Sequence, residues 1–122
     1  MKTDDLVKLI GKSKPTVLSA IKQGVFPFAT AYKSKPENKQ YTIFVHEEKV
    51  REYITGTDME FDLSVKGVAK LLGVTEGTIR HGMKNGIFPF GVAFKTKPTN
   101  RDFEFVFFPA KLAEYIGKKE VA

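Results

Sequence analysis

Lysine and arginine are the side chains in this sequence whose chemistry most clearly suggests a function, and they are distributed unevenly along the chain. Residues 11–40 and 73–102 together hold eleven Lys or Arg against three Asp or Glu, whereas the other 62 residues hold nine against eleven. A concentrated set of cationic side chains neutralises phosphates and gives an affinity for nucleic acid that falls with salt. The formal net charge of +6 permits an anionic partner but does not name one.

The sequence offers few residues for catalysis or metal binding. The chain has no Cys, which excludes disulfides and thiolate metal sites, and His46 and His81 do not coincide in the repeat described next. No Gly-rich phosphate loop, nucleophile elbow or metal motif is present. Glu52 and Glu114 repeat, but each stands beside a tyrosine and is expected to form a surface pair. We therefore expect no enzyme, no catalytic residue, no metal and no cofactor.

The two basic segments are copies of each other. Shifted by 62 residues, the chain aligns on itself without a gap, so that 6–54 lies over 68–116. GVFPF at 24–28 matches GIFPF at 86–90, and both copies close on EYI. This pattern indicates a tandem duplication. We expect a first unit at 1–56, a linker at 57–62 and a second unit at 63–122.

Each unit is expected to begin with two short helices separated by a tight turn. In the second unit, Ser64 and Thr75 are candidate N-caps, and Gly73 and Gly86 are candidate stops. In the first unit the corresponding signals are Thr3 or Asp4, then Gly11, then Ser13 followed by Pro15, and finally Gly24. Two short helices with a turn of three or four residues between them form a helix-turn-helix.

A β-hairpin and a closing helix are expected to follow in each unit. GIFPFGVAFK and EFVFFP read as strands joined by TKPTNRD, whose Pro, Asn and Asp mark a turn. Phe103, Phe105 and Phe107 alternate with Glu104 and Val106, as in a strand with one buried face. The predicted class is α+β, with two tandem winged helix-turn-helix units, each made of a helix-turn-helix, a hairpin wing and a C-terminal helix. GIFPF would be the joint that ends the second helix and pins the hairpin to the core.

The predicted second helix leaves a polar face for a partner. Ile79 and Met83, like Val17 and Ile21, are four residues apart and are expected to face the core. A helix about 10 Å wide fits the major groove of DNA, and the Lys-rich hairpin tips suit phosphates. The candidate DNA-binding residues are Lys12, Lys14, Thr16, Ser19, Lys22, Lys33, Lys35 and Lys39 in the first unit, and Thr75, Thr78, Arg80, His81, Lys84, Asn85, Lys95, Lys97 and Arg101 in the second.

The segment KGVAKLLGVTEGTIRHGMKNGIFPF resembles the excisionase/MerR-type winged helix-turn-helix of small phage and mobile-element proteins. The residues that carry the resemblance are Ala69, Leu72, Gly73, Val74, Thr75, Thr78, Ile79, Arg80, Gly86 and Pro89, with Leu9, Gly11, Ser13, Thr16, Val17, Gly24 and Pro27 in the first copy. The hairpin is more aromatic than in MerR regulators, and no long dimerisation helix follows, so an effector-sensing activator is not expected. The resemblance implies an architectural or regulatory DNA binder, such as a recombination directionality factor.

The expected function is therefore binding of double-stranded DNA, with two recognition helices reading two half-sites about one helical turn apart. An excisionase-like protein, a repressor and a partition factor remain open, as do a monomer and a homodimer, and a recombinase or another phage or host protein as a further partner. The alternative is a phage-encoded interaction module that inhibits a host protein with the same fold. No apolar run of about 18 residues predicts a membrane span, and a cytoplasmic place in a bacterial host is expected.

Overall fold

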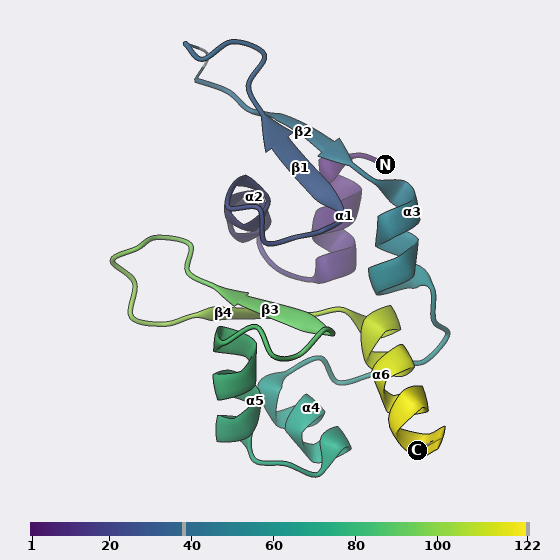
Figure 1. Ribbon diagram of the computed structural model, residues 1–122. Coiled ribbons are helices and arrows are strands. Elements are labelled where there is room, and N and C mark those ends of the chain that lie inside the picture. Colours follow the sequence, from purple (N-terminus) through teal and green to yellow (C-terminus); the bar gives the residue numbers. More distant parts are fainter. Residues whose placement is uncertain (38, 122) are drawn as a thin grey trace. The chain divides into compact units, whose positions relative to one another are not determined.

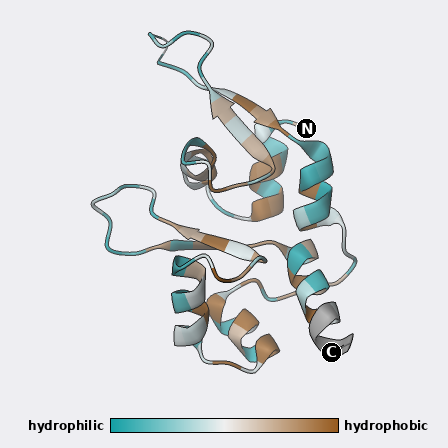
Figure 2. Ribbon diagram, in the orientation of Figure 1, coloured by the Kyte–Doolittle hydropathy of each residue, from teal (hydrophilic) through white to brown (hydrophobic). Residues whose placement is uncertain are grey.

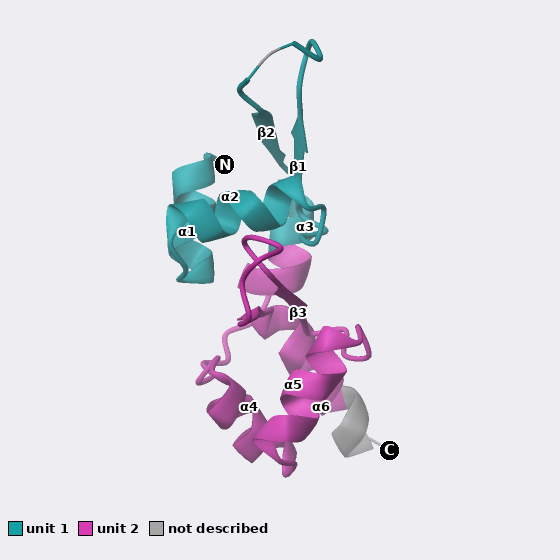
Figure 3. Ribbon diagram, turned by 90° about the vertical axis from the view of Figure 1, so that its left-hand side faces the viewer, with its two compact units in different colours: residues 1–50 teal, residues 51–122 magenta. Residues whose placement is uncertain are grey.

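The structure is a computed structural model that describes residues 1–37 and 39–121, with side chains described as far as residue 117 (Figure 1). In the described residues the chain is a small α+β protein with short helices and two antiparallel hairpins. It divides into two compact units, residues 1–50 and 51–122 (Figure 3).

The first unit runs helix, helix, hairpin, helix. Its elements are α1 (Thr3–Ile10), α2 (Lys14–Lys22), β1 (Ala29–Tyr32), β2 (Thr42–Val45) and α3 (Glu47–Val50). The two strands pair in antiparallel register, with Ala29 opposite Val45 and Tyr32 opposite Thr42. The loop between them is hydrophilic along its length (Figure 2).

The second unit repeats this order, and it also includes the segment that continues α3 and corresponds, under the 62-residue shift, to residues 113–117 of its own last helix. Its elements are η1, a π-helical turn (Arg51–Thr55), then α4 (Val65–Leu72), α5 (Glu76–Lys84), β3 (Gly91–Phe94), β4 (Glu104–Phe107) and α6 (Pro109–Val121). Gly91 lies opposite Phe107, and Phe94 lies opposite Glu104. The equivalent helices and strands of the two units each start 62 residues apart, so the sequence repeat is a structural repeat.

The two compact units divide between residues 50 and 51, because η1 packs against α6. Lys111 Nζ donates to Glu52 Oε1 at 3.1 Å and lies 4.8 Å from the ring centroid of Tyr53. The Tyr53 ring meets Phe108 edge-on at 5.5 Å. These contacts group residues 51–55 with the second unit.

Local capping explains where most helices begin and end. The Ser64 hydroxyl accepts from the Gly67 N–H at 2.9 Å and the Thr75 hydroxyl from the Thr78 N–H at 3.1 Å, which confirms both predicted N-caps. Gly73 ends α4 in the left-handed region, with a φ of 70°. The expected cap of α1 was wrong: Lys2 is its N-cap, so Thr3 and the acidic residues after it form the first turn, where acids favour the helix dipole.

The FPF joint fastens the second helix of each unit to the hairpin, as predicted. Phe88 stacks on Phe90 with ring centroids 4.9 Å apart, and Phe26 stacks on Phe28 at 5.0 Å. Phe90 is fully buried, and its carbonyl accepts from the N–H of Phe108, just after β4, at 2.7 Å. Phe90 therefore connects the segment after α5 with the hairpin, through its ring on Phe88 and Phe107 and through its carbonyl at Phe108.

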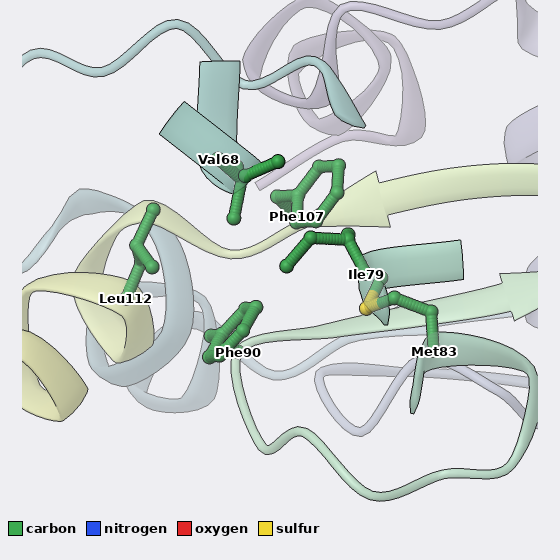
Figure 4. Packing of buried hydrophobic residues seen from close by; sticks show 7 residues of the cluster. Val68, Ile79, Met83, Phe90, Phe107 and Leu112 are labelled. Atoms are coloured by element: carbon green, nitrogen blue, oxygen red, sulfur yellow. The ribbon is translucent and has the colours of Figure 1, made fainter. Parts of the chain in front are cut away.

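The core of the second unit gathers apolar side chains from its helices and its hairpin (Figure 4). Ile79 is fully buried and Met83 is 3% exposed, so the predicted inward face of α5 is confirmed. Leu112 on α6 is fully buried too, and Ile116 packs against the same cluster. The buried cluster is Val68, Ala69, Ile79, Met83, Phe90, Phe107 and Leu112.

One pair of core positions shows how the two copies have diverged. A Cβ built on Gly91 would lie 2.5 Å from the Met83 terminal methyl and 2.6 Å from the Val106 carbonyl oxygen. The equivalent pair in the first unit is Ala29 with Ile21, both buried. The longer Met83 therefore accompanies a residue without a side chain, and the shorter Ile21 accompanies one with a methyl group.

One face of the hairpin is exposed in the first unit and buried in the second. Phe44 is 55% exposed and Tyr32 is 49% exposed, but their equivalents Val106 and Phe94 are each 3% exposed. The prediction that the Phe-rich strands are core therefore holds for the second unit and only in part for the first. Tyr41 and Phe103 lie just before β2 and β4, and each ring is contacted by two lysine side chains.

Candidate nucleic-acid interface

The predicted interface residues lie at the surface. Lys12, Thr16, Ser19 and Lys95 are partly buried, and the other candidates are exposed. In α2 and α5 the buried positions are those that face the core, which leaves the predicted partner face outward. The structure thus keeps the cationic side chains in each unit accessible.

The start of α5 holds an ion pair beside its N-cap. Arg80 donates to Glu76 Oε1 at 3.3 Å, one turn back along the helix, and both side chains are about half exposed. Such a pair contributes little, roughly 0.3–0.5 kcal/mol, so a phosphate or a guanine edge can replace the carboxylate. The hydroxyls of Thr75 and Thr78 lie 2.9 Å apart, and Thr75 also caps the helix.

The end of α5 is held by side chains that were predicted to contact DNA. Asn85 Nδ2 donates to the His81 carbonyl at 2.8 Å and lies 3.3 Å from the His81 ring. These bonds satisfy a C-terminal carbonyl of the helix. His81 and Asn85, which were predicted to bind DNA, therefore also have a local role in capping α5. Both residues remain exposed.

The equivalent helix α2 has its own local partners. The hydroxyls of Ser13 and Thr16 lie 2.8 Å apart, and Gln23 donates to the Ser19 hydroxyl at 2.9 Å. Lys14 pairs with Asp4 at 3.0 Å, with more than half of each side chain exposed. Lys14 and Asp4 thus form a solvated pair that links the first turns of α1 and α2.

Two aromatic rings gather the lysines of helix and hairpin, and sequence reasoning missed them. In the first unit, Lys22 Nζ lies 5.0 Å and Lys33 Nζ 4.9 Å from the centroid of the Tyr41 ring. We call these three residues the Tyr41 cluster. Lys22 ends α2, Lys33 follows β1 and Tyr41 precedes β2, so the cluster joins the second helix to the stem of the hairpin.

The second unit contains the same arrangement. Lys84 Nζ and Lys95 Nζ each lie 5.0 Å from the centroid of the Phe103 ring. We call these residues the Phe103 cluster. Phe103 was predicted as a strand residue, and the repetition of an aromatic residue beside a Lys-rich turn, at positions 41 and 103, was the signal that could have identified these rings.

The energetics of these clusters favour paired cations. The two ammonium groups on one ring are at most about 10 Å apart, so their repulsion in water is at least roughly 0.4 kcal/mol. A cation over an exposed aromatic ring gains about 0.5–1 kcal/mol. The ring therefore compensates for the repulsion without adding a negative charge, and each cluster keeps two positive charges.

The hairpin tips carry the remaining cations of the predicted interface. Lys35, Lys39, Lys97 and Arg101 are exposed. In the second tip, the Asn100 N–H donates to the Lys97 carbonyl at 3.0 Å and the Asn100 amide donates to Thr96 Oγ1 at 2.9 Å. These bonds order the turn, while its long basic side chains extend into solvent.

Within the described part of the chain, no group of three or more His, Cys, Asp or Glu side chains is placed to hold a metal ion. A small cavity of about 260 Å³ in the second unit is lined by Tyr53, Pro89, Lys111, Glu114 and Tyr115. None of these residues belongs to the predicted interface.

Comparison with known proteins adds no assignment, since no protein-family model, curated protein or solved structure matches the chain. The described residues include no helix that is long and apolar enough to cross a membrane.

Proposed function

We propose that the protein binds double-stranded DNA through two tandem winged helix-turn-helix units of the excisionase/MerR type. The second helices, α2 and α5, enter the major groove, and the hairpins act as wings on the flanking backbone. The observation that carries the proposal is the recurrence of a lysine pair that links helix end and hairpin stem in each unit. A phage or mobile-element regulator in the cytoplasm of a bacterial host is the setting that fits the sequence resemblance.

Within this proposal the residues have distinct roles. Arg80 is placed to read a base, because its weak pair with Glu76 is easily exchanged and a bidentate arginine–guanine contact discriminates by about 1–3 kcal/mol. Leu18 stands at the equivalent position of the first unit, so the two units read different bases or bind with different strength. The lysines of the clusters and tips position the protein on phosphates without reading sequence.

The test is a salt series of binding to random-sequence duplex DNA, followed by selection of a preferred site. The logarithm of the affinity should fall linearly with the logarithm of the salt concentration, with a slope of about 0.9 per neutralised phosphate. The variant Arg80→Ala/Lys84→Ala should lose the preferred site and weaken binding, while its circular dichroism spectrum stays unchanged. Unchanged DNA binding in this variant would refute the groove assignment.

The exposed aromatic side chains of the first hairpin favour a second candidate, a protein-interaction module. Phe44 and Tyr32 are about half exposed, and aromatic residues are enriched in protein interfaces. A host-protein inhibitor of this kind would bind its partner with little dependence on salt. Absence of salt-dependent binding to any duplex, together with loss of partner binding in Phe44→Ser, would favour this second function.

A further inference from the structure

We propose that the Tyr41 cluster and the Phe103 cluster are each a binding site for a single backbone phosphate of the duplex. Each site is held jointly by the second helix and the hairpin of its unit. This inference rests on the proposed DNA binding and deepens it, since it names the ligand group and the residues that hold it. The ring in each cluster is a positioning residue, because it acts through its lysines.

The ligand class follows from the charge of the clusters. Each ring lies about 5 Å from two ammonium groups and brings no carboxylate of its own, so the three residues of a cluster together carry a formal charge of +2. Lysine binds phosphate as a compact point charge with rotatable donors, and two such charges suit the two unbridged oxygens of a phosphodiester. A neutral or cationic ligand gains nothing from this arrangement.

The comparison of the two units identifies the property that matters in the ring. Tyr41 has a hydroxyl and Phe103 has none, but both hold their lysines at the same distance of about 5 Å. The aromatic face is therefore the shared feature, and the tyrosine hydroxyl is dispensable. The lysine positions coincide under the 62-residue shift as well, so the site has been kept whole in both copies.

The clusters would give DNA binding a geometric function. One lysine ends the second helix and the other leaves the first strand, so a shared phosphate fixes the helix in the groove and the hairpin on the backbone at once. Contacts of this kind set register and carry no sequence information.

The experiment measures binding of a fluorescent 24-base-pair random duplex across a salt series by anisotropy, with the full chain. If two lysines share one phosphate, Lys22→Ala/Lys33→Ala should reduce the slope by about one and not by about two, and the single variants should be non-additive. Tyr41→Leu should weaken binding several-fold. The matched control is Tyr32→Leu, which removes a half-exposed tyrosine from the same hairpin and should change affinity by less than twofold.

The cluster itself is checked without DNA. In the free protein, the Lys22 and Lys33 ε-methylene protons should be shifted upfield by the ring current, and Tyr41→Leu should abolish that shift. A slope reduced by two in the double variant, or equal binding by Tyr41→Leu and Tyr32→Leu, would overturn the shared phosphate. If the unmodified protein shows no salt-dependent binding, the proposed function itself fails. Lys84→Ala/Lys95→Ala repeats the slope test in the second unit, so one poorly folded variant does not decide the outcome.

Discussion

Lys111 shows how one side chain is tuned by its neighbours. Its hydrogen bond to Glu52 raises its pKa above the usual 10.5; burial works in the opposite direction, and the negative charges of Glu114 and Glu52 add to the increase. The ammonium also lies over the Tyr53 ring. Lys111 thus links η1 to α6 inside the second unit.

This raised pKa predicts a pH dependence of stability. A lysine with a raised pKa contributes fully below its unfolded value of 10.5, and the contribution is lost as pH rises through the higher folded value. Glu52→Gln should lower the free energy of unfolding by less than about 1 kcal/mol at pH 8, because Glu52 is 45% exposed. The difference from the unmodified protein should vanish above the folded pKa. Denaturant unfolding at pH 8 and pH 12 tests this, with the exposed Glu48→Gln as the control.

Because the equivalent hairpin faces differ in exposure, a threonine introduced at equivalent positions should change the stability of the two hairpins by different amounts. Val106→Thr places a hydroxyl at a position that is 3% exposed and should cost about 1–3 kcal/mol. Phe44→Thr changes the equivalent position, which is 55% exposed, and should stay within about 0.5 kcal/mol. Chemical denaturation of both variants measures these two changes in stability. Equal losses would mean that the Phe44 face is covered in solution.

At the scale of elements, the turn after α5 depends on one glycine. Gly86 has a φ of 66°, and nothing lies within 4 Å of a Cβ built on it, so an added methyl group would meet backbone strain alone. Gly86→Ala should therefore destabilise the protein by about 1–2 kcal/mol.

The control substitution should change the free energy of unfolding in the opposite direction. Gly77 lies inside α5, where alanine is favoured over glycine, and its added Cβ would meet only the Thr75 hydroxyl at 3.9 Å. Gly77→Ala should raise the free energy of unfolding by about 0.5–1 kcal/mol. Thermal or denaturant unfolding measures both, and a neutral Gly86→Ala would show that this turn relaxes.

The Met83 and Gly91 pair predicts a rescue. Gly91→Ala alone forces a methyl group against Met83 and the Val106 carbonyl, and should cost about 1–3 kcal/mol. Met83→Ile/Gly91→Ala rebuilds the pair found in the first unit and should recover part of this loss. A double-mutant cycle measures the coupling. Strict additivity would mean that the carbonyl alone causes the strain.

Most of these elements could be predicted from the sequence, since caps, glycine stops and alternating phenylalanines are local signals. Ser64, Thr75 and the inward face at Ile79 and Met83 are examples that the structure confirms. The start of α1 was a local signal that was missed, since the Lys2 N–H donates to the Asp5 carboxylate. The assignment of η1 could not be predicted, because it depends on contacts such as Lys111 with Glu52, 59 residues apart. The rings of the Tyr41 and Phe103 clusters were missed for the same reason.

At the scale of the whole molecule, the duplication itself predicts how affinity depends on the length of the DNA. If both units bind one duplex, the second contact is intramolecular and raises the apparent affinity. Shortening a random duplex from about 24 to about 10 base pairs should weaken binding by at least tenfold, because two sites about one turn apart no longer fit. Titration of duplexes of graded length at constant salt tests this. A smooth, shallow decline would indicate that one unit dominates.

The packing of Met83 against Gly91 also has an evolutionary consequence. Tandem copies in a gene can be homogenised by recombination, but a crossover between these two codons would join Met83 to an alanine like Ala29, or Ile21 to a glycine like Gly91. One product would be overfilled and the other would contain a void, and each fault costs stability. The halves of this gene are thus no longer interchangeable by a crossover that falls between these two codons.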